Sequence, residues 1–197
     1  MDHVRVSAWR DATPWRTSDG RCVRARPRLA RLIARAYDLV VQAIAIELAL
    51  SPTDEVRTLV GELEGLLAAD YTPEQRHGLS VEAIFQPRVR FFVARVGGAV
   101  VGCGGVALFS DFAEVKRMYV REVARGRGVA RALLDRVERE THDAGLDLLR
   151  LETGDRAHAA IRFYERAGFR RCSAFGAYAA MAPAAISTSV FYEKRVR

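Results

Sequence analysis

Hydrophobic and polar positions follow two different periods along the chain from about residue 39 onward. Alternation of apolar and polar residues is typical of half-buried strands, whereas apolar residues that recur every third or fourth position are typical of amphipathic helices. The strand pattern occupies residues 39–50, 89–96, 99–106, 115–120, 148–152 and 187–193. The first of these segments is almost continuously apolar and predicts a buried strand. Gly97-Gly98 predicts a tight hairpin between the second and third.

Helical patterns fall between the predicted strands, and several of them have recognisable ends. Ser51 or Thr53 is placed to cap the first helix, and Asp155 is placed to cap the last. Gly145 and Gly168 stand just beyond the ends of the last two helices, a position that favours glycine. Helices are predicted from 51–55 to the break at 71–73, over 80–85, through 130–140 and over 157–164.

Three glycines interrupt the strand predicted over 99–106. Gly102, Gly104 and Gly105 would weaken a strand unless another backbone or a ligand lies close. We therefore expect tight packing or a β-bulge at this point. Cys103 between them is predicted to be a small buried hydrophobe rather than a nucleophile.

The segment between residues 115 and 140 combines a strand, a glycine loop and a helix. The loop reads Arg125-Gly-Arg-Gly-Val-Ala130. Its glycines allow close approach of the backbone, and the free amides of the following helix favour an anion such as pyrophosphate. The next predicted strand and helix follow at a length that forms a right-handed parallel crossover. Alone, the loop is also consistent with a solvated turn, since it has neither dinucleotide-fold nor Walker spacing.

Two motifs in this part of the chain carry a family resemblance. Arg125-x-x-Gly128-x-Ala130 fits a pyrophosphate loop, and 160–169, Ala-Ile-Arg-Phe-Tyr-Glu-Arg-Ala-Gly-Phe, fits an A-x-x-F/L-Y-x-x-x-G-F helix. In this order and spacing, the chain resembles the GNAT superfamily of acetyl-CoA-dependent N-acetyltransferases. The resemblance implies one α/β domain over 39–197, with a mixed central sheet of about six to seven strands flanked by about four helices.

The resemblance also implies which residues contact acetyl-CoA, the acyl donor. Main-chain groups on the strand that ends at Val120 would meet the pantetheine arm, and the glycine loop would hold the pyrophosphate. Many relatives have Asn seven residues before the motif Tyr, whereas this chain has Ala157, so that contact is absent or replaced. The implied cofactor-binding residues are Met118, Tyr119, Val120, Arg125, Gly126, Arg127, Gly128, Val129, Ala130, Arg131 and Tyr164.

Acetyl transfer to an amine needs a proton acceptor and gains from a proton donor. A free alkylamine has a pKa of about 10, so a carboxylate, or a water held by one, must take its proton. Glu114, at the start of the cofactor strand, is the candidate base, with a solvated strand-end carboxylate as the alternative reading. Tyr164 is the candidate acid for the departing thiolate, with core packing as the alternative.

The first 38 residues differ from the rest of the chain. They hold nine arginines against four aspartates, which supplies most of the net charge of +7, and they show no sustained period. We expect a basic, poorly ordered N-terminal extension, with a short helix over 27–37 as the one amphipathic segment. It is either dispensable or translated from upstream of the true start.

Composition excludes several other classes of protein. No apolar run reaches the roughly 18 residues of a membrane span, and three widely spaced cysteines, at 22, 103 and 172, indicate neither a metal site nor a disulfide framework. All but two of the 31 basic residues are arginine, which points to codon bias rather than a phosphate-tracking stripe. We therefore expect a cytoplasmic protein without metal, membrane or nucleic-acid partners.

The predicted activity is transfer of an acetyl group to a primary amine. A small-molecule acceptor is the first choice, and a protein N-terminus or lysine is the second. A non-catalytic acyl-CoA-binding module and a homodimer remain open. The resemblance implies that residues 62–85 and 175–189 surround the acceptor, where carboxylates either attract a cationic amine or lie solvated; they are Glu62, Glu64, Asp70, Glu74 and Glu82.

Overall fold

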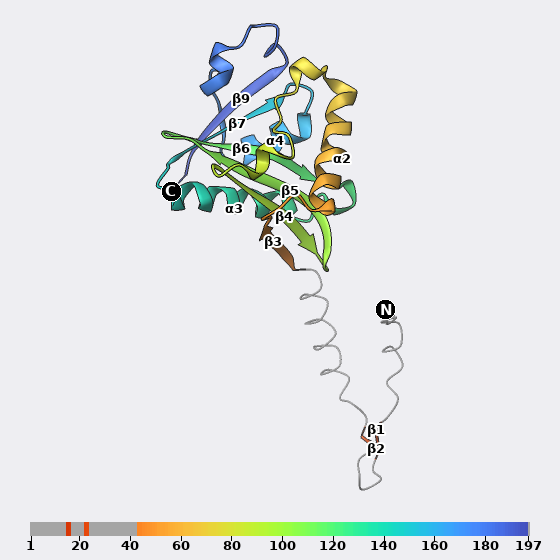
Figure 1. The fold of residues 1–197 in the computed structure, drawn as a ribbon. Helices are drawn as coiled ribbons and strands as arrows, with labels where there is room; N and C mark the ends of the chain where they lie inside the picture. The colour runs from red at the N-terminus through yellow and green to blue at the C-terminus, as the bar shows by residue number, and fades with distance from the viewer. Residues whose placement is uncertain (1–14, 17–21, 24–42, 197) are drawn as a thin grey trace. The chain divides into compact units, whose positions relative to one another are not determined.

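The computed structural model describes residues 15–16, 22–23 and 43–196 (Figure 1). Contacts divide the chain into two units, residues 1–43 and 44–197. In the first unit, strands β1 (Trp15–Arg16) and β2 (Cys22–Val23) pair antiparallel. The helix predicted over 27–37 lies outside the described residues, as does the start of the strand predicted from residue 39.

The second unit contains a seven-stranded sheet in the order β3-β4-β5-β6-β7-β9-β8. All neighbouring strands are antiparallel except β6 and β7, which are parallel. The mixed α/β sheet confirms the predicted fold class. The strands are β3 (Ile44–Leu48), β4 (Val89–Val96), β5 (Ala99–Leu108), β6 (Ala113–Val120), β7 (Leu148–Gly154), β8 (Arg170–Arg171) and β9 (Ser189–Arg195).

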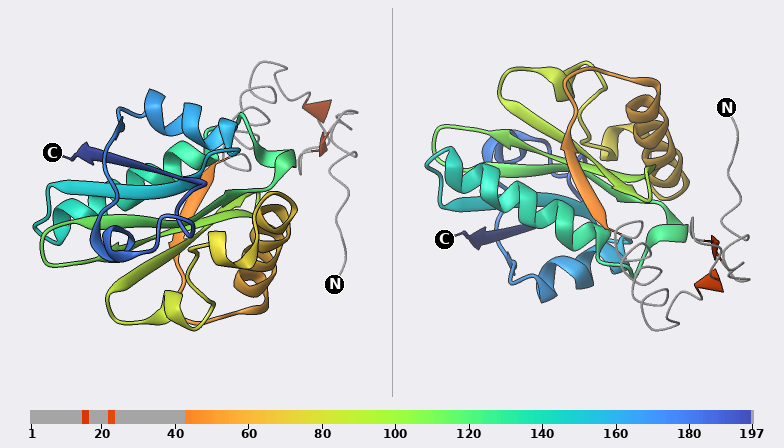
Figure 2. Two further views of the ribbon diagram at one scale, coloured as in Figure 1. Left: turned by 90° about the horizontal axis from the view of Figure 1, so that it is seen from above. Right: turned by 90° about the horizontal axis from the view of Figure 1, so that it is seen from below.

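Helices cover both faces of this sheet (Figure 2). Helix α2 (Asp54–Asp70) packs on one face, and α3 (Val129–Asp143) and α4 (His158–Arg166) pack on the other. The described residues contain these three α-helices rather than four. The helix predicted over 80–85 is only a 3₁₀ turn, Ala83–Phe85, because the segment is too short to complete two α-helical turns.

Local backbone signals account for the turns. Gly97 and Gly98 both have positive φ, as a two-residue hairpin requires. Gly145 and Gly168, with φ of 76° and 92°, terminate α3 and α4 as predicted. A Cβ on Gly105 would lie 2.7 Å from the carbonyl oxygen of Arg90, which confirms the tight packing expected of the strand glycines.

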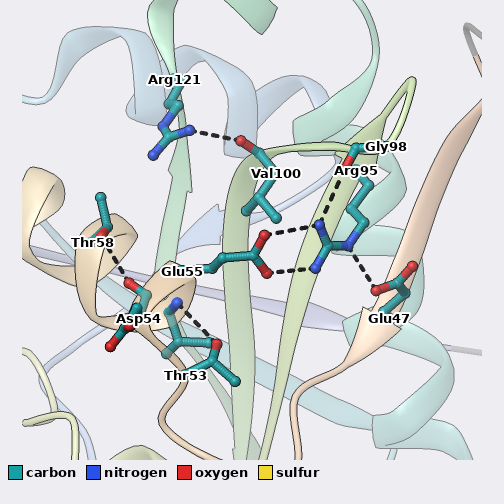
Figure 3. Close-up of polar contacts among 10 residues, drawn as sticks. Glu47, Thr53, Asp54, Glu55, Thr58, Arg95, Gly98, Val100 and Arg121 are labelled. Atoms are coloured by element: carbon teal, nitrogen blue, oxygen red, sulfur yellow. Dashed lines mark hydrogen bonds and ion pairs between the residues drawn. The ribbon is translucent and has the colours of Figure 1, made fainter. Parts of the chain in front are cut away.

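The segment predicted as a buried first strand is instead the half-exposed edge of the sheet. Leu48 is 42% exposed, because β3 pairs only with β4. Arg95 of β4 holds this edge in place (Figure 3). Its guanidinium contacts Glu47 of β3 at 2.9 Å, Glu55 of α2 at 2.5 Å and the Gly98 carbonyl at 3.2 Å.

The two predicted helix caps have different outcomes. Thr53 caps α2, and its hydroxyl accepts the amide of Val56 at 3.4 Å (Figure 3). Asp155 does not cap α4, which begins three residues later after Ala157. The turn is held elsewhere instead, since the Asp155 amide donates to the carbonyl of Thr188 at 2.8 Å.

Candidate active site

The parallel strands β6 and β7 separate soon after they meet. Their pairing consists of Ala113 with Leu149 and Glu114 with Arg150, although β6 continues to Val120. The edge of β6 beyond Glu114 is therefore not paired with β7. An opening of this kind exposes main-chain donors and acceptors to a ligand.

A β-bulge lies on β6 within this opening. Lys116 faces Gly105 and Tyr119 faces Cys103, so that two β6 residues oppose one β5 residue. Arg117 at the bulge has a φ of 54°, a strained backbone conformation that clusters at functional sites. Of the candidate contacts, Met118 lies in the bulge with Arg117, whereas Tyr119 and Val120 follow it; all three are half-buried.

The glycine loop joins β6 to α3. Gly126 and Gly128 have φ of 72° and 86°, which requires glycine, and no side chain caps the start of α3. A Cβ on Gly126 would meet nothing within 4 Å, so the loop surface is open. Arg125, Arg127 and Arg131 are exposed around it. Free first-turn amides and basic side chains fit the pyrophosphate of acetyl-CoA.

Tyr164 lies on α4 in the core shared with α3. Its ring is 6% exposed and packs edge-on to Phe169 at 5.6 Å between centroids. Burial raises the pKa of its hydroxyl. Within the described part of the chain, no hydrogen bond engages that hydroxyl.

Glu114 is buried on the α2 side of the sheet, 4% exposed, rather than a solvated strand-end carboxylate. Its Oε1 accepts from Lys116 Nζ at 2.6 Å and from the Tyr178 hydroxyl at 2.9 Å. Lys116 Nζ also donates to the Tyr178 oxygen at 2.9 Å. These bonds hold three side chains together.

Glu152 on β7 lies on the same face and was not a candidate from the sequence. It accepts from the hydroxyl of Ser189 at 2.6 Å. Burial raises the pKa of the Glu152 carboxyl, the Ser189 bond opposes that rise, and the charge of Glu114 adds to it. His77, whose ring meets the Tyr178 ring at 5.5 Å between centroids, completes the group.

We call Glu114, Lys116, Glu152 and Tyr178 the acceptor-face cluster. Its members come from distant parts of the sequence, so no local motif marks them. One signal was present: Glu152 follows Arg150 at strand spacing, and alternate residues of a strand share a face. The sequence predicts the strands of Glu114 and Glu152 to be parallel. It does not give their register, and the register decides whether the two side chains lie on the same face.

A cavity of about 470 Å³ lies between α2, residues 73–81 and the bulge of β6, and its lining residues Arg76 and Arg117 are the chain neighbours of His77 and Lys116. Arginines meet the carboxylates that the sequence placed near the acceptor. Glu64 binds Arg76 at 3.1 Å and also binds Arg117. Glu62 forms a two-point contact with Arg121, at 2.8 and 2.9 Å.

Other chemical sites are not evident in the described ranges 15–16, 22–23 and 43–196. No group of three or more His, Cys, Asp or Glu side chains there could hold a metal ion, and no helix there is long and apolar enough to cross a bilayer. Burial raises the pKa of the Cys103 thiol to about 12, which agrees with its expected role as a small core residue.

Comparison with known proteins identifies the domain. A family model described as an acetyltransferase (GNAT) domain matches residues 87–171. The chain is 42% identical over 127 residues to an IAA acetyltransferase from Azospirillum brasilense, covering 64% of this chain and 83% of the relative. It is 32% identical to the uncharacterized N-acetyltransferase YsnE of Bacillus subtilis, covering 63% and 84%.

Solved structures agree with this assignment. A Klebsiella pneumoniae protein assigned to the acyl-CoA N-acyltransferases shares 31% identity at a TM-score of 0.63, covering 78% of this chain and 98% of that one. A Thermoplasma acidophilum N-acetyltransferase bound to coenzyme A, at 19% identity and a TM-score of 0.59, shares the fold over 78% of this chain and 99% of its own. With its strand–loop–helix site and these relatives, the chain belongs to the GNAT superfamily of acetyl-CoA-dependent N-acetyltransferases and is an acyltransferase.

Proposed function

We propose that this enzyme transfers an acetyl group directly from acetyl-CoA to the primary amine of a small molecule. The observation that carries the proposal is the opening between β6 and β7, which has an anion-binding loop on one side and a cluster of buried carboxylates on the other. The glycine loop and α3 lie at one side, and the acceptor-face cluster lies at the other. Acetyl-CoA supplies an activated acyl group, which a neutral amine can attack without further activation.

The donor is held by β6 and the loop. The main chain of Met118, Tyr119 and Val120 binds the pantetheine arm along the unpaired edge, and residues 125–131 bind the pyrophosphate. The open surface at Gly126 and the uncapped start of α3 support this placement. Because the contacts are mainly to backbone, the loop conformation matters more than its side chains.

Two carboxylates are candidates for the proton acceptor. Glu114 is the candidate from the sequence, but its Oε1 already accepts hydrogen bonds from Lys116 and Tyr178. Glu152 is favoured by a separate observation, since burial raises its pKa. A carboxylate with a raised pKa is a stronger base at neutral pH. We therefore assign proton acceptance to Glu152 first, with Glu114 holding Lys116 beside it.

Tyr164 is the proposed donor to the departing thiolate. Burial keeps its hydroxyl protonated at neutral pH, as a proton donor requires. The alternative is that the ring serves only to pack α4 against the core, and kinetics of a hydroxyl deletion separate the two.

A small acceptor is supported by the size of the cavity between α2 and the bulge of β6. Its volume of about 470 Å³ lies within the range of small-molecule sites. A protein N-terminus or lysine is the alternative acceptor. A module that binds acyl-CoA without turnover is the alternative of another class, which the buried polar cluster argues against because such a module needs no proton acceptor.

Release of free thiol from acetyl-CoA by the full chain, measured across a panel of small amines and lysine peptides, tests the proposal. We expect turnover with a subset of the small amines and mass spectrometry to show one added acetyl group. Turnover confined to peptides would favour the protein-acceptor alternative. If calorimetry shows tight binding of acetyl-CoA but no amine causes thiol release, the result would favour the module that binds acyl-CoA without turnover.

A further inference from the structure

The cavity between α2 and the bulge of β6 carries more positive than negative charge. Its lining includes the guanidiniums of Arg57, Arg76 and Arg117 but only one carboxylate, Glu64. Glu82 approaches Arg57 from outside the lining at 4.0 Å. Even with Glu82 counted, the guanidiniums outnumber the carboxylates. A cationic group is therefore disfavoured here, and an anionic group is complementary.

Arg117 is built into the wall of this cavity. Its side chain is 5% exposed, its Nε donates to the carbonyl of Leu79 at 2.6 Å, and its Nη1 contacts Glu64. A Cβ on Gly78 would collide with the guanidinium, so a larger residue there would displace the arginine from this position. A buried guanidinium in a fixed position is pre-organised for a planar anion.

Glu64 does not neutralise the two arginines that it contacts. It shares its single charge between Arg76, whose side chain is 21% exposed, and Arg117. Arg57 is half-exposed at the mouth of the same cavity. When Glu82 is included, three guanidiniums face two carboxylates, which leaves one positive charge. One further carboxylate would neutralise that charge, whereas a dianionic phosphate would exceed it.

The cavity and the acceptor-face cluster share two stretches of chain. Arg76 precedes His77, whose ring packs against Tyr178 of the cluster. Arg117 follows Lys116, which is a member of the cluster. A small molecule long enough to reach from the arginines to the cluster would place one end at each.

We propose that the cavity binds a carboxylate of the acceptor, so that the substrate class is a small amine that also carries a carboxylate. The inference rests on the proposed acetyl transfer and specifies its acceptor. Arg57 and Arg76 bind the carboxylate directly, and Arg117 forms the fixed wall. The amine then lies on the side of Glu114 and Glu152, where its proton is removed.

Matched acceptor pairs test the inference. Each pair is an ω-amino acid, whose amine and carboxylate stand at opposite ends, and the amine that lacks only its carboxylate, such as 4-aminobutanoate with propylamine and 6-aminohexanoate with pentylamine. Ethanolamine phosphate serves as the phosphate-bearing probe. We expect kcat/KM for the best amino acid to exceed that of its partner amine by about 10-fold or more.

Variants assign the preference to the arginines. Arg76→Gln and Arg57→Gln should each lower kcat/KM for the amino acid by about 10-fold while that for the partner amine stays within about twofold. Arg76→Lys, which keeps the charge, should recover part of the loss. Arg139→Gln, an exposed residue of α3 outside this cavity, is the control and should behave as wild type.

The outcomes separate this inference from the proposed function. Acetylation of amines regardless of a carboxylate, or a preference for ethanolamine phosphate, would overturn the inference and leave acetyl transfer standing. Equal losses for both members of a pair in Arg57→Gln, with an unchanged melting temperature, would also overturn it. No thiol release with any amine, despite bound acetyl-CoA, would instead count against the proposed function.

Discussion

At the scale of single residues, Glu114 and Glu152 carry the same group in different surroundings. Glu114 is deeply buried, and two donors bind one of its oxygens. Glu152 accepts one hydrogen bond, from the Ser189 hydroxyl, and burial is the main cause of its raised pKa. Two carboxylates in such different surroundings can take different roles.

The pH dependence of two variants should distinguish those roles. Glu152 must be ionised to accept a proton, and its pKa is raised. As the pH is lowered, wild-type kcat/KM should therefore begin to fall at a higher pH than it would with an ordinary glutamate as the base. Glu152→Gln should lose about 10²-fold at neutral pH and recover as pH rises toward the pKa of the amine.

Glu114→Gln is the matched comparison. If Glu114 only holds Lys116, the variant should lose less activity and keep the acid limb of the wild-type profile. Recovery at high pH in Glu114→Gln, with a wild-type profile in Glu152→Gln, would make Glu114 the base instead.

Tyr164→Phe tests the proton donor at the same scale. The change removes only a hydroxyl, so acetyl-CoA should still bind while kcat falls by about 10²-fold or more. Tyr192→Phe is a control in the same core, because it removes a buried hydroxyl that donates to Glu165 at 2.9 Å. It should lower stability by about 1 kcal/mol and leave kcat unchanged. If Tyr164→Phe keeps the wild-type kcat, the hydroxyl is not the proton donor and the ring only packs in the core.

At the scale of elements, the start of α3 combines a loop of two glycines in the left-handed region with a free helix end. Gly128→Ala should weaken acetyl-CoA binding by about 10-fold, roughly 1.4 kcal/mol, since the methyl group enters the space proposed for pyrophosphate. Within the protein that methyl meets only Ile44 Cδ1, at 3.7 Å. Calorimetry measures the affinity.

Gly145→Ala supplies the control at the opposite end of α3. Its φ of 76° imposes similar backbone strain, and its Cβ meets nothing within 4 Å. Both variants should lose stability by about 1 kcal/mol or more, but only Gly128→Ala should lose affinity. Equal affinities in the two folded variants would remove the loop as the pyrophosphate site.

Elements with local signals could be predicted from the sequence. The β4–β5 hairpin and the glycine stops at 145 and 168 depend on backbone requirements within a few residues. The failed cap at Asp155 depends on a distant contact, the carbonyl of Thr188, which outweighs local preference. Edge exposure of β3 likewise follows from sheet order, which the apolar pattern of one strand does not encode.

The candidate site has the same two kinds of part, local motifs and residues that only the tertiary structure brings together. The glycine loop and the helix of Tyr164 are continuous motifs, so residue types and spacing were enough to propose them as site elements. Lys116, Glu152 and Tyr178 meet only when β6, β7 and the segment before β9 come together. Their proximity is a property of tertiary structure, and residue pattern alone left them as ordinary strand and loop positions.

At the scale of the whole molecule, the second unit contains the sheet, both sides of the opening and the cavity. Residues 44–197 form their own compact unit. A chain that begins at Leu39 should therefore fold and turn over like the full chain, within about twofold in kcat/KM and a few degrees in melting temperature. Thermal unfolding and thiol release measure both. Insolubility, or a large fall in melting temperature, would show that residues before 39 belong to the enzyme domain.

Strand order has a consequence for biosynthesis. Strand β9 pairs along the whole of β7 and separates it from β8, and its first residue, Ser189, binds Glu152. A nascent chain still on the ribosome can form the β4–β5–β6 meander early, because those contacts are local. The acceptor face cannot assemble until residues 189–195 have emerged from the exit tunnel. Translation intermediates can thus contain an intact glycine loop before the proposed proton-accepting side is complete, so on this proposal acetyl transfer needs the finished sheet.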